Sequence, residues 1–511
     1  MPEYLSPGVY VEEIEIGAKP IEGVSTSTAG FMGETERGPT LPTLITSWLE
    51  YQRVYGGYFG SDKYLPYAVE GFFRNGGQRC YIARIIKKTA LKASLTLMTG
   101  VVANAPEAII VEAIGEGAWG KKIAVKTKNS ADGKTFKLSV FYWKQPLAAL
   151  YDPDDNRRED RDKPRPDVVE VFSNISVDKT SPDYYETTVN SRSNLIQIKK
   201  PSGDAAIPSD STITLLEGGT GDETAPGLDD YKRTDITTPG QKKGLTSFED
   251  INGISIVYVP NTSGIQGLYD ELVSHCENLK DRFAIVDVAK GTSNPTSPGD
   301  TKYAAFYCPW INIVDPETGS TILVPPGGHI AGIYARSDVE RGVHKAPANE
   351  KVRGADSLEF PISKGKQDTL NPQGINCIRA FGSRGIRVWG ARTLSTDSLW
   401  KYINVRRLFL YLEESIENGT QWVVFEPNNE KLWARVKQTI TQFLTTVWKD
   451  GALMGKTPEE AFFVKCDRTT MTQDEIDNGK LVVLIGVAPV KPAEFVIFRI
   501  AQWQGGSAAT E

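Results

Sequence analysis

The stretch AEFVIFRIAQW, Ala493 to Trp503, is the most informative part of this 511-residue chain. Apolar side chains fall on both sides of it, with Phe495 and Ile497 alternating with Val496 and Phe498. A strand that is apolar on both faces needs a sheet around it, and no neighbouring stretch can form a hairpin with it. The sequence therefore predicts a terminal strand whose partners lie elsewhere.

A second strand without a neighbour lies near the start of the chain. VYVEEIEI, Val9 to Ile16, is isolated by glycines on both sides, and its apolar alternation slips near Glu12, as a β-bulge would make it. We expect residues 1–22 to form an arm that carries this strand. The alternative is a solvated, frayed terminus.

Composition excludes several classes of function. The formal net charge of −6 provides no field that would attract nucleic acid. No run of about 18 apolar residues predicts a membrane-spanning helix, and the opening MPEYLSPGVYVEE resembles no signal peptide, so we expect folding in the cytoplasm. The five cysteines are widely spaced and form no CxxC pair, which argues against a disulfide framework or a zinc site.

Strand and helix patterns divide the chain into several parts, which predict a mixed α/β and α+β multidomain fold. We expect a C-terminal mixed sheet with flanking helices, a split α/β middle domain and a β-rich inserted domain. The expected boundaries are 1–22 for the arm, 23–90 with 241–350 for the middle domain, 91–240 for the insertion, and 351–511 for the C-terminal core domain with its terminal strand. The two pieces of the middle domain should complete one sheet.

The C-terminal core contains the clearest helical pattern. Between Asn429 and Asp450, apolar residues recur every three or four positions, and Gly451 provides a stop. The stretch from 397 to 418 has similar spacing, and two strands should follow before the terminal one. The polar side of the 429–450 helix carries Lys431 and Arg435, one turn apart.

Candidate catalytic and ligand-binding motifs fail on inspection. GEGAWGKK at 115–122 has a lysine where a phosphate loop needs Ser or Thr, and GALMGKT at 451–457 is one residue too short. The charged run at 152–167 starts with calcium-loop spacing, but Arg157 and Lys163 replace the turn glycine and the final glutamate, which leaves a solvated loop. We therefore expect no catalytic residue, metal or cofactor.

Two further features have a structural and a chemical reading. His275 and Cys276 are adjacent on a predicted helix, so their side chains do not face each other, and a buried pair is the simpler reading. VPPGGHIAGIYAR, Val324 to Arg336, is a glycine-rich turn that leads into a helix. It could hold an anion, although a purely structural turn is the simpler explanation.

Several stretches, taken together, resemble the sheath subunit of contractile phage tails and related contractile injection systems. The resembling stretches include SPGVYVEEI, NGGQRCYIARI, GAWGKKIAV, YAAFYCPWI and VPPGGHIAGIYARSDVERGVHKAPAN, and in the C-terminal third GIRVWGARTLS, KYINVRRLFLYLEESIE, FEPNNEKLW, EEAFFVKCD and APVKPAEFVIFRI. They occur in the family's order along nearly the whole chain. The charged loop at 152–167 matches nothing in the family.

This resemblance implies a non-enzymatic subunit that polymerises around an inner tube in a metastable extended lattice and then contracts. It implies partners of three kinds: further copies in stacked hexameric rings, an inner tube protein, and baseplate and terminal cap proteins, without nucleic acid or membrane insertion. It also implies that both arms join sheets of neighbouring subunits. The implied arm residues are Val9, Tyr10, Val11, Glu12, Ile14, Ile16, Phe495, Val496, Ile497, Phe498 and Ile500.

We further expect Lys431 and Arg435 to face acidic residues of the tube. Assembly should occur in the cytoplasm, in a particle that can later be released, and the chain alone does not separate a phage tail from an extracellular injection system. An alternative of a different class is a cytosolic hydrolase that uses Cys276 or Cys308 with a histidine.

Overall fold

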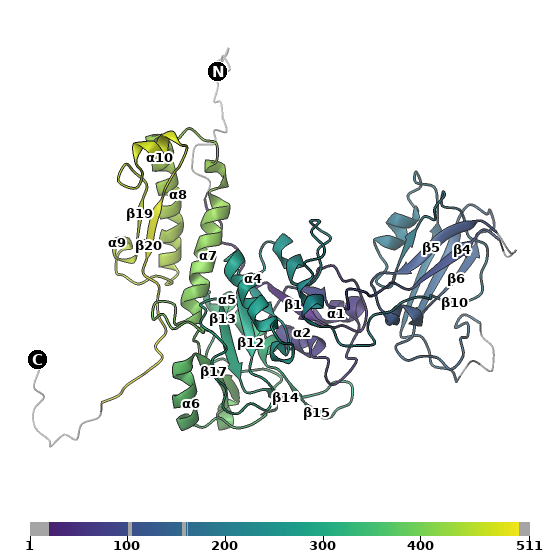
Figure 1. Cartoon of the computed structure of the whole chain (residues 1–511), viewed down its shortest axis with the longest axis horizontal. Coiled ribbons are helices and arrows are strands. Elements are labelled where there is room, and N and C mark those ends of the chain that lie inside the picture. The colour runs from purple at the N-terminus through teal and green to yellow at the C-terminus, as the bar shows by residue number, and fades with distance from the viewer. Residues whose placement is uncertain (1–19, 101–104, 156–159, 161, 500–511) are drawn as a thin grey trace, which may run out of the picture.

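The computed structural model describes residues 20–100, 105–155, 160 and 162–499. A central sheet lies in the middle of the molecule, an inserted β-rich unit extends from one side, and a helical unit lies on the other side (Figure 1). This arrangement confirms the expected mixed multidomain fold class.

The central sheet contains eight strands in the order β18-β17-β13-β12-β11-β1-β3-β2. Their bounds are β1 (Ala29–Gly33), β2 (Thr43–Ile45), β3 (Cys80–Arg84), β11 (Ile256–Tyr258), β12 (Phe283–Asp287), β13 (Ala304–Cys308), β17 (Ile375–Ala380) and β18 (Ile386–Val388). The strands from β3 to β17 pair in parallel, while β2 and β18 close the edges antiparallel. Parallel strands need cover on both faces, which explains why β1, β12 and β13 are buried along their whole length.

The pairing of β1 with β11 joins the two pieces of the middle domain in one sheet, as expected, although the insertion separates them in sequence. One boundary differs from the expectation. The C-terminal core was expected to begin near residue 351, but β17 pairs with β13, and β18 pairs with β17, so residues up to about 388 complete the central sheet. The difference arises because β17 is a short buried strand whose partner lies about 70 residues earlier, which no local pattern reveals.

Helices cover the sheet, and two of them approach unusually closely. The helices of this part are α1 (Trp48–Tyr55), α2 (Leu65–Arg74), α3 (Leu228–Lys232), α4 (Leu268–Leu279), α5 (Gly327–Arg341) and α6 (Lys364–Leu370). A Cβ on Gly328 would lie 2.4 Å from the backbone of Ala68, and one on Gly332 would lie 2.4 Å from the carbonyl of Phe72. The glycine-rich motif therefore permits α2 and α5 to pack backbone to backbone, which supports its structural reading.

The N-terminus of α5 meets a carboxylate of the protein itself. Asp287, at the end of β12, is fully buried, accepts a hydrogen bond from the backbone N–H of Gly327 at 2.9 Å, and accepts another from the hydroxyl of Tyr258. Burial raises the pKa of Asp287 to about 7. The group that meets this helix end is therefore a carboxyl of the protein itself, from a neighbouring strand.

The inserted unit is a sandwich of two antiparallel sheets, ordered β10-β6-β7-β8 and β4-β5-β9. Its strands are β4 (Ser94–Met98), β5 (Glu107–Ala113), β6 (Ile123–Asn129), β7 (Phe136–Tyr142), β8 (Val168–Ile175), β9 (Ile196–Lys199) and β10 (Thr214–Leu215). Side chains of both sheets, such as Val111 and Val125, belong to one core that is separate from that of the central sheet. The expected charged loop follows β7, and its Asp152 pairs with Lys126 of β6.

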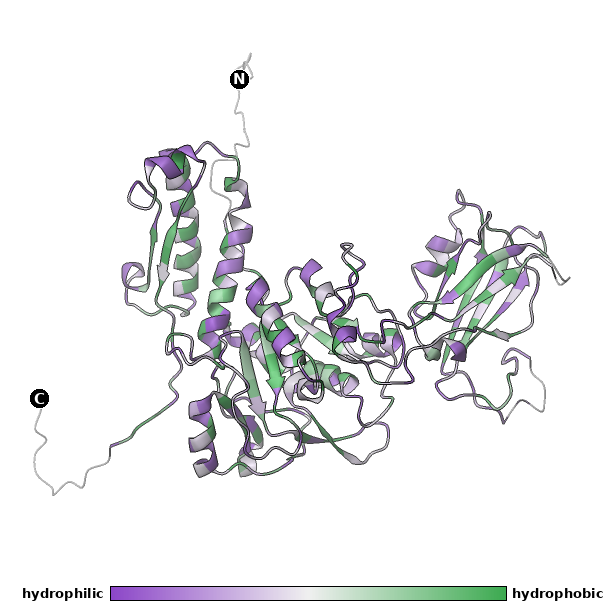
Figure 2. Ribbon diagram, in the orientation of Figure 1, coloured by the Kyte–Doolittle hydropathy of each residue, from purple (hydrophilic) through white to green (hydrophobic). Residues whose placement is uncertain are grey.

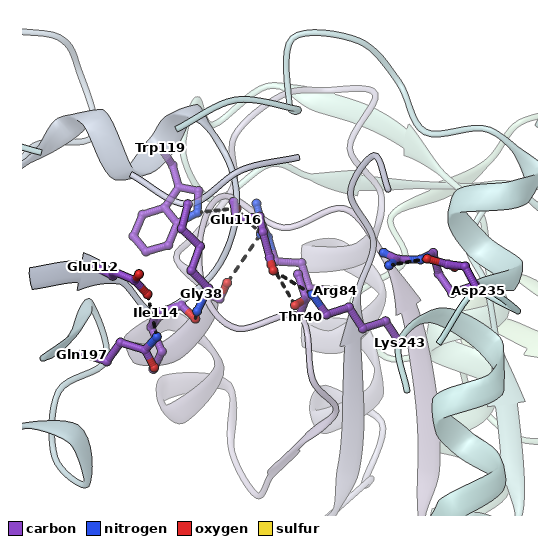
Figure 3. A network of polar contacts seen from close by, with 12 residues as sticks. Gly38, Thr40, Arg84, Glu112, Ile114, Glu116, Trp119, Gln197, Asp235 and Lys243 are labelled. Atoms are coloured by element: carbon purple, nitrogen blue, oxygen red, sulfur yellow. Dashed lines mark hydrogen bonds and ion pairs between the residues drawn. The ribbon is translucent and has the colours of Figure 1, made fainter. Parts of the chain in front are cut away.

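A polar network fixes the sandwich to the central sheet (Figure 3). The Glu116 carboxylate accepts hydrogen bonds from Thr40 at 2.9 Å and from Lys243 at 2.7 Å, while Arg84 at the end of β3 and the Trp119 indole donate to the Glu116 carbonyl. Burial alone would raise the pKa of Glu116, but the bonds and charge of Lys243 outweigh it and lower the pKa to about 2. The junction is thus a charged, hydrogen-bonded neck.

The helical unit contains α7 (Ile403–Gly419), α8 (Glu430–Lys449), α9 (Pro458–Ala461), α10 (Gln473–Asp477), β19 (Phe462–Lys465) and β20 (Leu484–Val487). The apolar positions expected to share one side of α8 are buried, namely Trp433, Val436, Ile440, Phe443 and Val447. Asn429 caps the helix by accepting hydrogen bonds from the backbone N–H groups of Lys431 and Leu432.

A short three-stranded sheet made of β14 (Ile311–Val314), β15 (Thr321–Val324) and β16 (Ser357–Leu358) lies beside the central sheet.

A buried ion pair connects the helical unit to the central sheet. Arg407 of α7 donates to both carboxylate oxygens of Asp338 on α5, at 2.9 and 2.6 Å, and both side chains are almost fully buried. The same guanidinium donates to the carbonyl of Thr26, just before β1, and lies over the Tyr334 ring. One side chain therefore holds together α7, α5 and the segment that enters the sheet.

The buried carboxyl of Asp287 predicts a measurable pH effect. Its pKa is raised in the folded state, so its contribution to stability is complete below about pH 4 and is lost as the pH rises through about 7. We expect Asp287→Asn to gain stability relative to the unsubstituted protein over this range, by at most about 1.4 kcal/mol per pH unit. Urea unfolding at pH 4.5 and 7.5 measures the difference.

The matched control for that measurement is Asp62→Asn, which makes the same substitution at an exposed aspartate. A difference between Asp287→Asn and the unsubstituted protein that does not change with pH would contradict the role assigned to this carboxyl.

Candidate assembly interface

The C-terminal segment is anchored to the body of the molecule at Glu494. Both carboxylate oxygens accept from Arg392, each at 2.8 Å, and they also accept from Asn371 at 2.8 Å and from the Tyr402 hydroxyl at 3.0 Å. Burial alone would raise the pKa of Glu494, but the hydrogen bonds from Arg392 and Asn371 outweigh it and lower the pKa. Four donors on one half-buried carboxylate make a firm fixing point.

Beyond this fixing point the apolar segment leaves the body. Phe495, Val496, Ile497 and Phe498 are 71%, 68%, 77% and 84% exposed. The segment shows as hydrophobic on the chain that leads away toward the C-terminus (Figure 2). Residues 493–499 join no strand of the described chain. Four successive exposed apolar side chains are costly in water, so this segment has the properties of an arm that lacks its partner.

The other predicted arm residues lie outside the described part of the chain. These are Ile500 and the whole stretch from Val9 to Ile16. The described chain begins near them, however, and Ile21 is buried against Gly419 at the end of α7, where a glycine Cβ would lie 2.6 Å from it. Ile21 was expected to belong to the arm, but it packs in the core of the helical unit.

The two arms begin at opposite ends of α7. The N-terminal segment passes Gly419 at the last turn, while Glu494 is held by Tyr402 directly before the first turn. At 1.5 Å per residue these two points are about 25 Å apart along the helix.

The small sheet of the helical unit has two open edges. β19 and β20 pair only with each other within the described chain, in the register Phe463↔Gly486, and their inward side chains cover α8. On the outward side the Phe463 ring lies over Gly486, beside the exposed Leu484. A two-stranded sheet with free edges, which exposes Phe463 and Leu484 beside Lys465 on its outer face, is marginal alone and favours the addition of further strands.

The polar side of α8 is basic. Lys431, Arg435 and Lys437 are exposed there, and Arg435 stacks on the Trp422 ring at 4.6 Å. The one acidic residue of the helix, Glu430, lies 3.3 Å from Arg468. The structure thus brings the two predicted tube-facing residues onto one surface without a neighbouring carboxylate on the same helix to neutralise them.

The chemistry that a hydrolase would need is unfavourable at the cysteines considered. Cys276 and Cys308 are fully buried, and burial raises the pKa of both thiols to about 12, so the thiolate nucleophile is scarce at neutral pH. Burial, together with the charge of Arg282, lowers the pKa of His275 to about 3. These groups behave as parts of the core, as the simpler reading of the sequence holds.

The described residues contain neither a metal site nor a membrane-spanning helix. No group of three or more His, Cys, Asp or Glu side chains is arranged to hold a metal ion. No helix in the same part of the chain is long and apolar enough to cross a membrane.

Sequence reasoning missed the anchor of the C-terminal arm. Glu494 is a lone acid before an apolar run, and its partners come from residues 371 to 402, far away in the chain. The available signal was the charge itself, because a glutamate within an otherwise apolar terminal strand requires a partner.

Two family descriptions match the chain over more than half of its length. The phage tail sheath protein central domain matches residues 234–394, and the phage tail sheath C-terminal domain matches residues 395–502. The first match ends where β17 and β18 complete the central sheet, and the second contains the helical unit and the anchored arm.

Individual relatives agree with this family. The tail sheath protein of Vibrio phage KVP40 is 30% identical over 34% of this chain and 26% of its own length. A putative prophage major tail sheath protein of Pseudomonas aeruginosa is 26% identical over 52% of this chain and 72% of its own length. The chain thus spans about a quarter of the first relative and nearly three quarters of the second.

A solved structure is similar over nearly the whole chain. The contracted helical sheath of the anti-feeding prophage gives a TM-score of 0.58 at 24% identity and covers 97% of this chain and 99% of that one. Together with the two family matches, this agreement in fold leads to one conclusion. The chain belongs to the phage tail sheath family of structural proteins.

Proposed function

We propose that this chain is the structural subunit of a contractile sheath. Copies polymerise around an inner tube as a metastable extended helical lattice and then contract, which drives the tube through a target envelope. The observation that carries the proposal is the exposed apolar segment Phe495–Phe498, which starts directly after a carboxylate held by four donors. Such a segment is fixed at its root and exposes apolar surface to another copy.

The partner of each arm is the β19–β20 sheet of neighbouring subunits. One donated strand forms about half a dozen backbone hydrogen bonds, at about 1 kcal/mol net apiece. It also buries two or three apolar side chains, at about 1.5 to 3 kcal/mol each. These contributions hold a link that bends without separating, which a lattice needs if it is to change its pitch.

Contraction draws on energy stored during assembly rather than on a nucleotide or another cofactor. Subunits pack first in an extended arrangement and then repack in a wider and shorter one, and a small gain in free energy per subunit is multiplied over many copies.

In this proposal the protein is not an enzyme. Its further partners are the tube, baseplate and cap proteins, and assembly takes place in the cytoplasm. A phage tail and an extracellular injection particle remain equally compatible with the chain.

The arm assignment predicts a specific failure of assembly. Expressed alone, the chain should form hollow, ridged cylinders by negative-stain microscopy. Deletion of residues 1–20, or of 495–511 with Glu494 retained, should leave a folded monomer that no longer forms a connected sheath, because Ile21 and the Glu494 anchor both remain. Intact cylinders from either truncated chain would refute the assignment.

The basic side of α8 predicts a charge-dependent contact with the tube. The double change Lys431→Glu and Arg435→Glu should abolish co-sedimentation with the tube, and binding of the unaltered protein should weaken as salt is added. The folded monomer should persist because both residues are exposed.

A matched control for this test is Lys134→Glu with Lys200→Glu, which reverses two exposed charges on the inserted sandwich. Equal tube binding by both double variants would remove α8 from the tube interface.

A further inference from the structure

A groove opens beside the root of the C-terminal arm. It has a volume of about 950 Å³ and lies between the end of α5, the helix α6, the stretch after β18 and residues 490–496. Its lining includes the rings of Phe381 and Trp389, whose centroids lie 4.4 Å apart. Both side chains are half-buried, so an aromatic surface is left open to a further segment of chain.

The lining of this groove is positively charged. It contains six Lys or Arg side chains and two carboxylates, and both carboxylates are already paired. Glu494 is held by Arg392, and Asp368 lies 3.4 Å from Lys364. The groove therefore keeps an excess of positive charge that its own acids do not neutralise.

Two cations on the rim carry this excess. Arg341 and Lys491 are exposed, and neither has an ion-pair partner among the residues that the structure describes. Three acids nearby lie outside the lining. Glu340 precedes Arg341 but lies on another side of α5, since successive helical residues are about 100° apart. Glu350 pairs with a lysine of the lining, and Asp450 follows the end of α8.

The N-terminal arm has the complementary composition. Residues 1–19 contain four glutamates and one lysine, and VYVEEIEI, Val9 to Ile16, combines acidic with apolar side chains. The C-terminal arm fits the groove less well, because its residues 495–511 carry Arg499 and no acid before Glu511. An acidic, apolar strand matches an aromatic groove with a basic rim.

The N-terminal arm is long enough to reach the groove of its own subunit. Ile21 is held beside Gly419 at the last turn of α7, whereas Tyr402, which lines the groove, directly precedes the first turn. These points are about 25 Å apart along the helix. Eight extended residues span about 26 Å, so Glu12 and Glu13 come level with Tyr402, and the residues before them extend into the groove.

We propose that the N-terminal arm of an unassembled subunit docks in this groove of its own chain, with Glu12 and Glu13 at Arg341 and Lys491. Attachment to the same chain gives the arm a high effective concentration at the groove, which favours it over the arm of another copy. A docked arm is withheld from neighbours, so the groove delays polymerisation. The inference rests on the proposed function for the later partner of the arm, whereas the docked state belongs to the single subunit.

The test measures hydrogen exchange of the backbone amides of residues 9–16 in the full-length chain, at a dilution where light scattering shows monomers. We expect Arg341→Glu with Lys491→Glu to speed this exchange about tenfold, because the reversed charges repel the arm. The same double variant should form cylinders after a shorter lag. The fold should persist because both positions are exposed.

An exchange of charges between the two sides tests the contact directly. Adding Glu12→Lys and Glu13→Lys to the double variant should restore slow exchange, because the ion pairs form again with the signs reversed. The matched control is Lys134→Glu with Lys200→Glu on the sandwich, which should leave the exchange of residues 9–16 unchanged.

Fast exchange of residues 9–16 in the unaltered monomer would overturn this inference, and so would slow exchange that the rim variant does not change. Protection that appears only as the protein concentration rises would also overturn it, by assigning the groove to the arm of another copy. These readings come from monomers. Failure of the unaltered chain to form cylinders under any condition would instead count against the proposed function, and it would leave a docked arm in place.

Discussion

The structure depends on the buried pair between Arg407 and Asp338. Removing two charges from water is expensive, and burial raises the pKa of Asp338 in spite of the adjacent guanidinium. A pair of this kind adds little net stability, but separating its partners leaves an uncompensated buried charge at a cost of about 3 to 5 kcal/mol. Because Arg407 also binds the carbonyl of Thr26, the helical unit cannot leave the central sheet without that penalty. The ion pair therefore resists separation of the two parts.

The inserted sandwich is attached by different means. Its own core is separate, and its neck consists of ionic and backbone hydrogen bonds around Glu116 rather than shared apolar packing. Hydrogen bonds and ion pairs are directional, so they fix the orientation of the sandwich. Because water can replace them as partners, they contribute less net free energy than a continuous apolar core would. The sandwich is thus joined to the central sheet by polar contacts, with an apolar core of its own.

Local patterns were sufficient to predict the regular elements. The three-and-four spacing of α8, the alternation of strands in the insertion and the apolar runs of β12 and β13 all follow from the period of side chains along a helix or strand. The sequence also showed that Phe495 to Phe498 lack a partner nearby. The family resemblance added the role of the arms, which periodicity cannot provide.

Features that depend on distant residues could not be predicted. The addition of β17 to the central sheet, the anchoring of Glu494 by Arg392 and the left-handed backbone of Phe425 each arise from three-dimensional context rather than from a repeating pattern. The loop between α7 and α8, residues 420–429, contains the start of the family motif FEPNNEKLW, and the exposure of Phe425 follows from how the two helices are placed.

The two ends of α7 have a consequence for how the protein can vary. In the proposed sheath, a pull from one neighbour enters beside Gly419 and leaves at Glu494, so the load runs along α7 and its contacts and does not pass through the sandwich. Regions that bear no load are free to diverge. The family matches at 234–502 include α7, whereas residues 1–233, which contain the sandwich strands β4 to β10 and also β1 to β3 of the central sheet, lie outside them. In the proposed sheath, substitutions on the surface of the sandwich should therefore leave the links between subunits unchanged.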